Sequence, residues 1–180
     1  MADDRSSVID DFSQPHPMAA NGASWEFVAD TVMGGVSSGG IDRVTVAGRP
    51  ALRLQGTVRL DNNGGFIQAA LDLNPDGSDH DARAFSGLNI DLHGDGADYD
   101  IRVRTSDLSR PWQSYRHAIT AAPRWVTYRI PFASFTPHRT DRPLDKGKLR
   151  RIGVLAIGSA TRLGLRLAVS DFSVVPKIAA

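Results

Sequence analysis

The stretch Asp30-Thr31-Val32-Met33-Gly34-Gly35-Val36-Ser37 is the part of the chain around which the rest is arranged. It has neither helical nor strand periodicity, and its adjacent glycines allow positive φ angles or close approach of another segment. Asp30 and Ser37 carry oxygens that hydrogen-bond nearby backbone groups and fix a loop. We therefore expect a shaped loop that is braced by Asp30 and Ser37 and anchored to a core by its apolar residues, Val32, Met33 and Val36. A simpler interpretation is a tight connection between two strands.

Segments that alternate apolar and polar residues lie on both sides of this loop. In residues 51–60 the even-numbered positions from Leu52 to Leu60 share one face, which is the period of a half-buried strand. Residues 44–46 form a hairpin with this segment across residues 47–50. Further strands are expected at 7–12, 25–29, 66–73, 87–92, 99–104, 114–120, 125–130, 151–157 and 163–175. Because Gly, Pro and Asn turns separate these segments and none has the period of a long helix, the pattern predicts an all-β sandwich or barrel.

Composition and charge limit the classes of function. The 180 residues include 41% hydrophobic and 23% charged residues, which is typical of one globular domain, here taken as 1–180. The net charge of +1 gives no bulk attraction to nucleic acid or to an anionic membrane, and no apolar run is long enough to span a bilayer. Residues 1–6 have no apolar signal core and are too short and acidic for a transit peptide, so we expect a cytoplasmic protein. The chain has no cysteine for a disulfide or a thiolate nucleophile.

Four motifs, in order, resemble those of the complex I intermediate-associated protein 30 domain family. They are Trp25 with Asp30-x-x-Met33-Gly34-Gly35-Val36-Ser37, Asn63-Gly64-Gly65-Phe66, Gly94-Asp95-Gly96-x-x-Tyr99, and Trp125 with Pro131-Phe132. The resemblance covers residues 7–175 and implies a jelly-roll β-sandwich of the galactose-binding-like kind. It also implies a non-enzymatic, protein-binding assembly factor or chaperone for NADH:ubiquinone oxidoreductase (complex I), with respiratory-complex subunits as partners. The predominance of Arg among the basic residues suggests a bacterial member.

The alternative is a carbohydrate-binding module. Trp112, Tyr115 and Arg116 come at the start of an expected strand, and aromatic rings beside a charged group are typical of sugar-binding faces and of protein–protein contacts alike. Four arginines on the outer faces of neighbouring strands could bind an anionic partner: Arg102, Arg104, Arg116 and Arg129. A purely structural interpretation places Trp25, Trp125 and Tyr128 in the core. The candidate binding residues for a protein or a sugar are Asp30, Met33, Gly34, Gly35, Ser37, Asn63, Gly65, Trp112, Tyr115 and Arg116.

Motifs for catalysis and metal binding are incomplete. The residues 35–39 match the G-x-S-x-G pattern of a hydrolase elbow, but no helix-forming run follows them. Residues 72–77 match the first half of a calcium loop, whereas Arg83 stands where a bidentate acid is needed, so calcium binding by the loop 72–81 is left open. The five histidines lack metal-ligand spacing. We expect no enzyme activity, no cofactor and no catalytic or metal-ligating residue.

Overall fold

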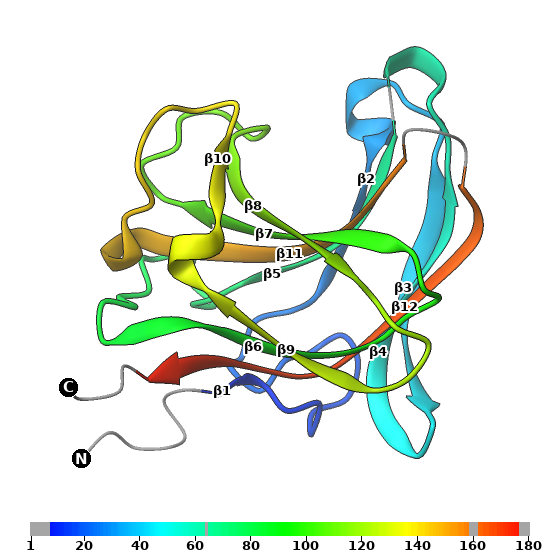
Figure 1. The fold of residues 1–180 in the computed structure, drawn as a ribbon, viewed down its shortest axis with the longest axis horizontal. Helices are drawn as coiled ribbons and strands as arrows, with labels where there is room; N and C mark the ends of the chain where they lie inside the picture. The colour runs from blue at the N-terminus through cyan, green and yellow to red at the C-terminus, as the bar shows by residue number, and fades with distance from the viewer. Residues whose placement is uncertain (1–7, 64, 159–161, 177–180) are drawn as a thin grey trace.

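Two antiparallel sheets form a β-sandwich in the computed structural model, which describes residues 8–63, 65–158 and 162–176 (Figure 1). Sheet I has the strand order β3-β4-β12-β6-β9, with β1 paired to β12, and sheet II has the order β10-β8-β7-β11-β5-β2. The strands are β1 (Val8–Asp10), β2 (Glu26–Ala29), β3 (Ser38–Val46), β4 (Arg49–Val58), β5 (Phe66–Asp72), β6 (Phe85–His93), β7 (Asp98–Thr105), β8 (Ser114–Thr120), β9 (Val126–Pro131), β10 (Thr136–His138), β11 (Leu149–Ile157) and β12 (Arg162–Pro176). The predicted all-β class is confirmed.

Helical structure in the described ranges is limited to short 3₁₀ turns: η2 (Asp30–Met33), η3 (Asp61–Asn63), η4 (Phe132–Ser134) and η5 (Lys146–Lys148). A helix with the length and apolarity needed to cross a membrane is not found among these residues. The predicted signal-free segment at residues 1–6 lies outside the described residues.

Side chains alternate between the core and the surface as the period of two predicts. Leu52, Leu54 and Val58 of β4 are fully buried between the sheets, and Tyr99, Ile101 and Val103 of β7 are buried opposite them. Burying each such side chain stabilises the fold by roughly 1.5–3 kcal/mol. The alternation also directs the even-numbered residues of β7 to the outer face of sheet II.

The first hairpin is longer and tighter than predicted. Strand β3 begins at Ser38, and only Ala47 and Gly48 lie in the turn, so that Arg49 and Pro50 already pair with β3. Both turn residues have left-handed backbone angles, with φ of 45° and 81°, as in the two-residue turn that matches strand twist. The glycine-rich start of β3 concealed this strand, because Gly is a poor strand former.

The chain crosses between the sheets after β9. Strand β9 lies in sheet I, η4 follows, and β10 pairs with β8 in sheet II. The strand β10 was expected to be loop, since its sequence is only Thr136-Pro137-His138. This crossing places His138 beside Ser114 at the edge of sheet II.

A buried carboxylate organises the N-terminal segment. Asp10 is fully buried, and it accepts hydrogen bonds from the Trp25 indole at 2.7 Å and from the Phe12 and Ala20 amides. Arg43 of β3 lies over the Phe12 ring at 4.9 Å, and it donates to the Phe12 carbonyl oxygen. Since Arg43 is paired with the buried Leu52, its side chain leaves β3 on the inner face of sheet I.

The two tryptophans predicted to lie in the core differ from each other. Trp25 is buried as predicted, with 3% of its surface exposed. Trp125 is only half-buried. The Arg49 guanidinium lies over its ring at 4.6 Å, and its indole N–H donates to the Val46 carbonyl oxygen. The prediction that Trp125 belongs to the core is therefore wrong, because the chain reaches it before β9 turns its side chains inward. Tyr128 is also half-buried, packed against the core.

Candidate functional site

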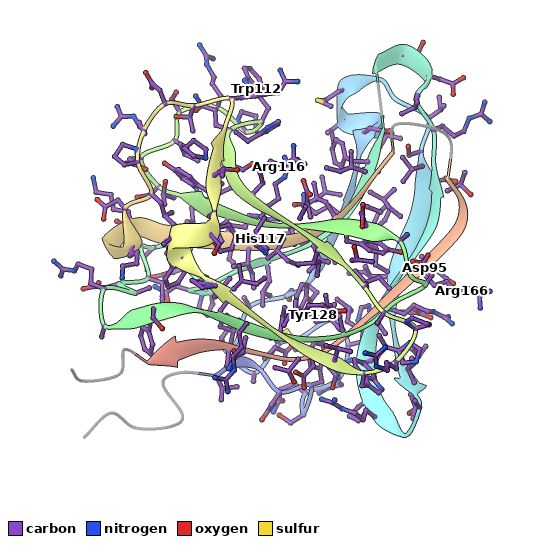
Figure 2. The ribbon with its side chains drawn as sticks, in the orientation of Figure 1. Asp95, Trp112, Arg116, His117, Tyr128 and Arg166 are labelled. Carbon is purple, nitrogen blue, oxygen red and sulfur yellow. The ribbon has the colours of Figure 1, made fainter. Side chains whose placement is uncertain are left out.

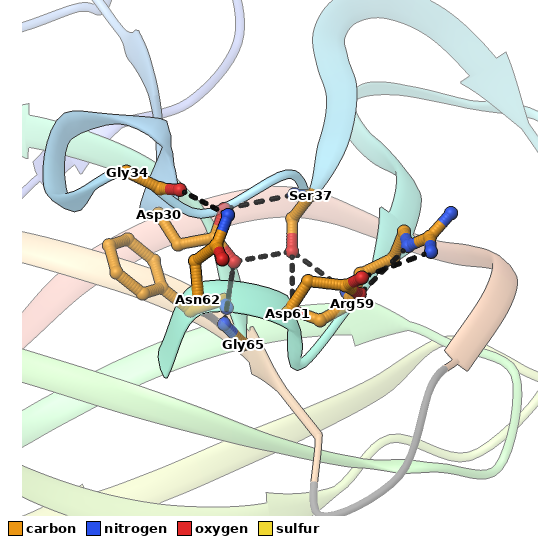
Figure 3. A network of polar contacts seen from close by, with 8 residues as sticks. Asp30, Gly34, Ser37, Arg59, Asp61, Asn62 and Gly65 are labelled. Atoms are coloured by element: carbon orange, nitrogen blue, oxygen red, sulfur yellow. Dashed lines mark hydrogen bonds and ion pairs between the residues drawn. The ribbon is translucent and has the colours of Figure 1, made fainter.

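The braced loop consists of residues 30–37, between β2 and β3, and of residues 59–63 with Gly65, between β4 and β5. Asp30 lies at its centre and is fully buried. Its carboxylate accepts hydrogen bonds from the Ser37 amide at 3.0 Å and the Ser37 hydroxyl at 2.5 Å, and from the Gly65 and Phe66 amides at 2.5 and 3.2 Å (Figure 3). The Ser37 hydroxyl oxygen in turn accepts a hydrogen bond from the Arg59 backbone amide at 2.8 Å. Asp30 and Ser37 therefore brace the loop through its amides, as predicted.

These hydrogen bonds also decide the protonation state of Asp30. Burial raises the pKa of this carboxyl, but the bonds from Ser37, Gly65 and Phe66 more than offset burial, so its pKa lies below the ordinary value of 3.8. Asp30 is thus ionised at neutral pH and acts as an acceptor only.

Both glycines of the loop are required by its shape. Gly34 has a left-handed φ of 86° and ends η2. At Gly35 a Cβ atom would lie 2.5 Å from the Asp30 carboxylate, which leaves no room for a side chain. The Asn62 amide donates to the Gly34 carbonyl oxygen at 3.2 Å and ties the two segments together.

The apolar side chains of the loop point to solvent. Val32 is 73% exposed, Met33 54%, Val36 44%, and Leu60 of the neighbouring segment 39%. The prediction that Val32, Met33 and Val36 anchor the loop to the core is wrong, because Asp30 provides the inward anchor and η2 turns the other side chains out. Leu60, expected on the buried face of its strand, is exposed because β4 ends at Val58. We call these four residues the apolar ridge.

The remaining predicted site residues divide between the two edges of sheet II. Gly65 belongs to the braced loop, and Asn63 has its backbone in η3, with its side chain outside the described part. Trp112 and Arg116 lie at the other edge, where Trp112 is 52% exposed (Figure 2). Tyr115 does not take part in a surface site: it is fully buried, its hydroxyl donates to the Pro143 carbonyl oxygen, and its ring cannot stack on a ligand.

Charged side chains cover the outer face of sheet II between these groups. Asp100 of β7 is paired with Arg102 at 3.1 Å and with Arg116 of β8 at 2.9 Å. Asp100 is only 5% exposed although it points outward, so this pairing is sheltered from water. Arg129 is not part of the group, because β9 belongs to sheet I. Asp100 and His138 were missed from the sequence, since only the pairing of β7, β8 and β10 brings them beside Arg116.

The motifs for catalysis and calcium have other partners. Ser37 donates its hydroxyl to Asp30 and is followed by β3 rather than by a helix, so it lacks the setting of a nucleophile elbow. In the loop 72–81, Asp72 pairs with Arg151, and Arg83 lowers the pKa of Asp81 to about 2 through its side-chain hydrogen bond. Within the described ranges no three His, Asp or Glu side chains are placed to hold a metal ion.

Comparisons with solved structures reveal the same fold. A family 11 carbohydrate-binding module from Clostridium thermocellum, in complex with a β-1,3-1,4-mixed-linked tetrasaccharide, superposes with a TM-score of 0.72 at 16% identity, covering 97% of both chains. A family 30 carbohydrate-binding module has a TM-score of 0.58 at 18% identity, over 79% of this chain and 92% of its own. An exo-β-agarase matches with a TM-score of 0.61 at 12% identity, over 96% of this chain and 25% of its own. These likenesses confirm the jelly-roll β-sandwich.

Comparison by sequence identifies a family as well as a fold. None of the curated proteins compared matches the chain. The model of the family described as complex I intermediate-associated protein 30 (CIA30) matches residues 11–168, a range that includes the braced loop and all the strands of sheet II. The chain therefore belongs to the complex I intermediate-associated protein 30 family.

Proposed function

We propose that this chain is a non-catalytic, protein-binding domain that recognises its partner through the apolar ridge. The observation that carries the proposal is the exposure of Val32, Met33, Val36 and Leu60 on a loop whose backbone is held by the buried Asp30. Exposed apolar side chains cost solubility, and when they gather at one place they commonly mark an interaction surface.

Rigidity of the loop favours recognition over a merely connecting role. A loop that is already ordered loses little conformational entropy when a partner binds, which leaves more of the contact energy as affinity. The sandwich supplies the scaffold, and loops on such a scaffold frequently carry function. Met33 suits this role because its flexible, polarisable side chain adapts to irregular surfaces.

Membership of this family supports a role for the domain in the assembly of a respiratory complex. We propose that the partner is a subunit or assembly intermediate of NADH:ubiquinone oxidoreductase and that this domain acts as a chaperone or scaffold, in the cytoplasm of a bacterium. The family's description names an association with complex I intermediates, and the apolar ridge is a suitable surface for a subunit that is not yet fully assembled.

The test compares two exposed methionines. Met33→Ala removes the centre of the apolar ridge, whereas Met18→Ala changes a methionine of 37% exposure in the loop before β2. We expect both variants to melt within a few degrees of wild type. Tagged Met33→Ala should capture less of the respiratory-complex subunits from the native cell, and Met18→Ala should capture the wild-type amount. Unchanged capture by Met33→Ala, or a large loss of its melting temperature, would contradict the proposal.

A second candidate function is carbohydrate binding, which the exposed ring of Trp112 favours. The C. thermocellum module of the same fold holds a tetrasaccharide. Aromatic rings present a flat apolar surface, and Trp112 presents one at the edge of sheet II. A glycan array would support this function if it gave hits that Trp112→Ala abolishes, and an array without hits would count against it.

A further inference from the structure

Arginines outnumber carboxylates around Asp100, at the β8 edge of sheet II. Arg102 and Arg116 both pair with the carboxylate of Asp100, and Arg139 directly follows strand β10, which pairs with β8. Asp100 already accepts from both Arg102 and Arg116, and no carboxylate in the described part of the chain pairs with Arg139. The cluster is therefore short of negative charge.

Contacts within the cluster hold Arg116 ready for a ligand. Arg102 is sheltered, with 14% of its side chain exposed, and it donates to the Ser114 hydroxyl as well as to Asp100. Arg116 has 38% of its side chain exposed and is held by Asp100 through one nitrogen, Nη2. A guanidinium held in this way offers a planar pair of donors that matches a carboxylate.

Strand pairing brings these cations close together, since Arg102 of β7 lies opposite Arg116 of β8 and His138 of β10 lies opposite Ser114. Burial lowers the pKa of Arg102, Asp100 partly counters this effect, and the charges of Arg116 and Arg139 add to it. Burial and then the charges of Arg102, Arg116 and Arg139 lower the pKa of His138. His138 is thus uncharged at neutral pH. An anion placed at Arg116 and Arg139 would relieve the repulsion among the guanidinium groups.

Trp112 is tied to this cluster by Arg104. The Arg104 guanidinium donates to the carbonyl oxygens of Gln113 and Arg110, each at 3.0 Å, and so fixes the loop that carries the exposed ring. The Gln113 amide donates to the Arg139 carbonyl oxygen at 3.2 Å and connects this loop to the one after β10. Figure 2 shows Trp112 above Arg116 at the same edge of the molecule.

We propose that this edge of sheet II binds an acidic saccharide, with Arg116 and Arg139 on a uronate carboxylate and Trp112 against a sugar ring. A uronic acid combines a carboxylate with a flat C–H face, and the site offers a partner for each. An acidic peptide has the carboxylates but no such face for Trp112. The proposal deepens the second candidate function and does not need the apolar ridge.

The test is native gel electrophoresis through alginate, polygalacturonate or hyaluronate. We expect at least one of these uronate polymers to retard the protein, and neutral mixed-linked β-glucan to leave its mobility unchanged. Arg116→Gln and Trp112→Ala should each weaken the retardation by about tenfold, which is typical of a charge-assisted hydrogen bond or a buried ring contact. Arg129→Gln, an exposed arginine on sheet I, is the matched control and should behave as wild type.

Three results would overturn the proposal: no retardation by any uronate polymer, full retardation of Arg116→Gln, or equal retardation by polyglutamate that Trp112→Ala does not affect. If Arg116→Gln melts early because Asp100 loses its partner, the exposed Arg139→Gln replaces it in the same gel. Met33→Ala should leave retardation intact and Arg116→Gln should leave subunit capture intact, so failure here is distinct from failure of the protein-binding function.

Discussion

At the scale of single residues, the hydrogen bonds of the buried Asp30 stabilise the conformation of the braced loop. Replacing it with Ala leaves the amides of Ser37, Gly65 and Phe66 without their acceptor. Each buried donor left unsatisfied costs about 1–3 kcal/mol, so we expect Asp30→Ala to lower the free energy of unfolding by about 3 kcal/mol or more. Urea unfolding measures this loss.

The matched control is Asp61→Ala in the same loop pair. Asp61 forms an exposed ion pair with Arg59, and such pairs contribute little, so its midpoint should stay close to that of wild type. Equal losses for Asp30→Ala and Asp61→Ala would mean that Asp30 does not organise the loop.

Acid should weaken the fold through His80. Burial lowers the pKa of His80 below its ordinary value of 6.5, partly countered by the charge of Asp81, and its Nε2 atom is buried without a partner. Because the folded state holds the proton less tightly than the unfolded chain, stability is constant above the unfolded pKa and falls as pH decreases below it. Urea midpoints at about pH 7.5 and pH 5 should therefore differ more for wild type than for His80→Gln. A variant with the same pH dependence as wild type would rule out this role.

Site residues could be predicted where residues close in the sequence hold them in place. They could not be predicted where only the pairing of two strands brings them together. Asp30 and Ser37 flank two glycines, and this spacing alone implies hydrogen bonds to loop amides. Tyr115 and Arg116 are adjacent in one strand, so the outer position predicted for Arg116 already places Tyr115 in the core, and naming both as binding residues was inconsistent. Asp100 comes beside Arg116 only through the pairing of β7 with β8.

At the scale of elements, the turn between β3 and β4 contains an unfavourable backbone conformation at Ala47 that a substitution can relieve. Ala47 has a left-handed φ of 45°, which costs a residue with a Cβ about 1–2 kcal/mol, whereas Asn tolerates it well. We expect Ala47→Asn to raise the free energy of unfolding by about 0.5–1 kcal/mol, measured by thermal or urea unfolding. A destabilised variant would show that the turn has another geometry in solution.

Strand interiors were predicted better than strand ends. The alternation in β4, β7 and β8 identified each strand because one face of each is buried. The start of β3 and the whole of β10 were missed, since Ser-Gly-Gly and Thr-Pro-His have weak strand propensity and owe their conformation to pairing with β4 and β8.

At the scale of the whole molecule, most strand pairs join distant parts of the chain. Strand β12 pairs with β1, β4 and β6, and β5 pairs with β2 and β11. Such non-local pairing slows folding, because long loops must close before the contacts form. We expect stopped-flow refolding in milliseconds to seconds or slower, and a dominant microsecond phase would contradict this expectation.

The inward arginine of β3 has a consequence for self-association. Strand β3 is the longest edge strand of the described sheets, with nine residues, and an open edge of this length invites another chain to add a strand. Arg43 opposes such addition, because a second molecule continuing the sheet would have to enclose a cation that already has two buried nitrogens without partners. We therefore expect Arg43 to hinder edge-to-edge association through β3. Arg43→Leu should accordingly give concentration-dependent oligomers in sedimentation velocity, where wild type sediments as one species at every concentration.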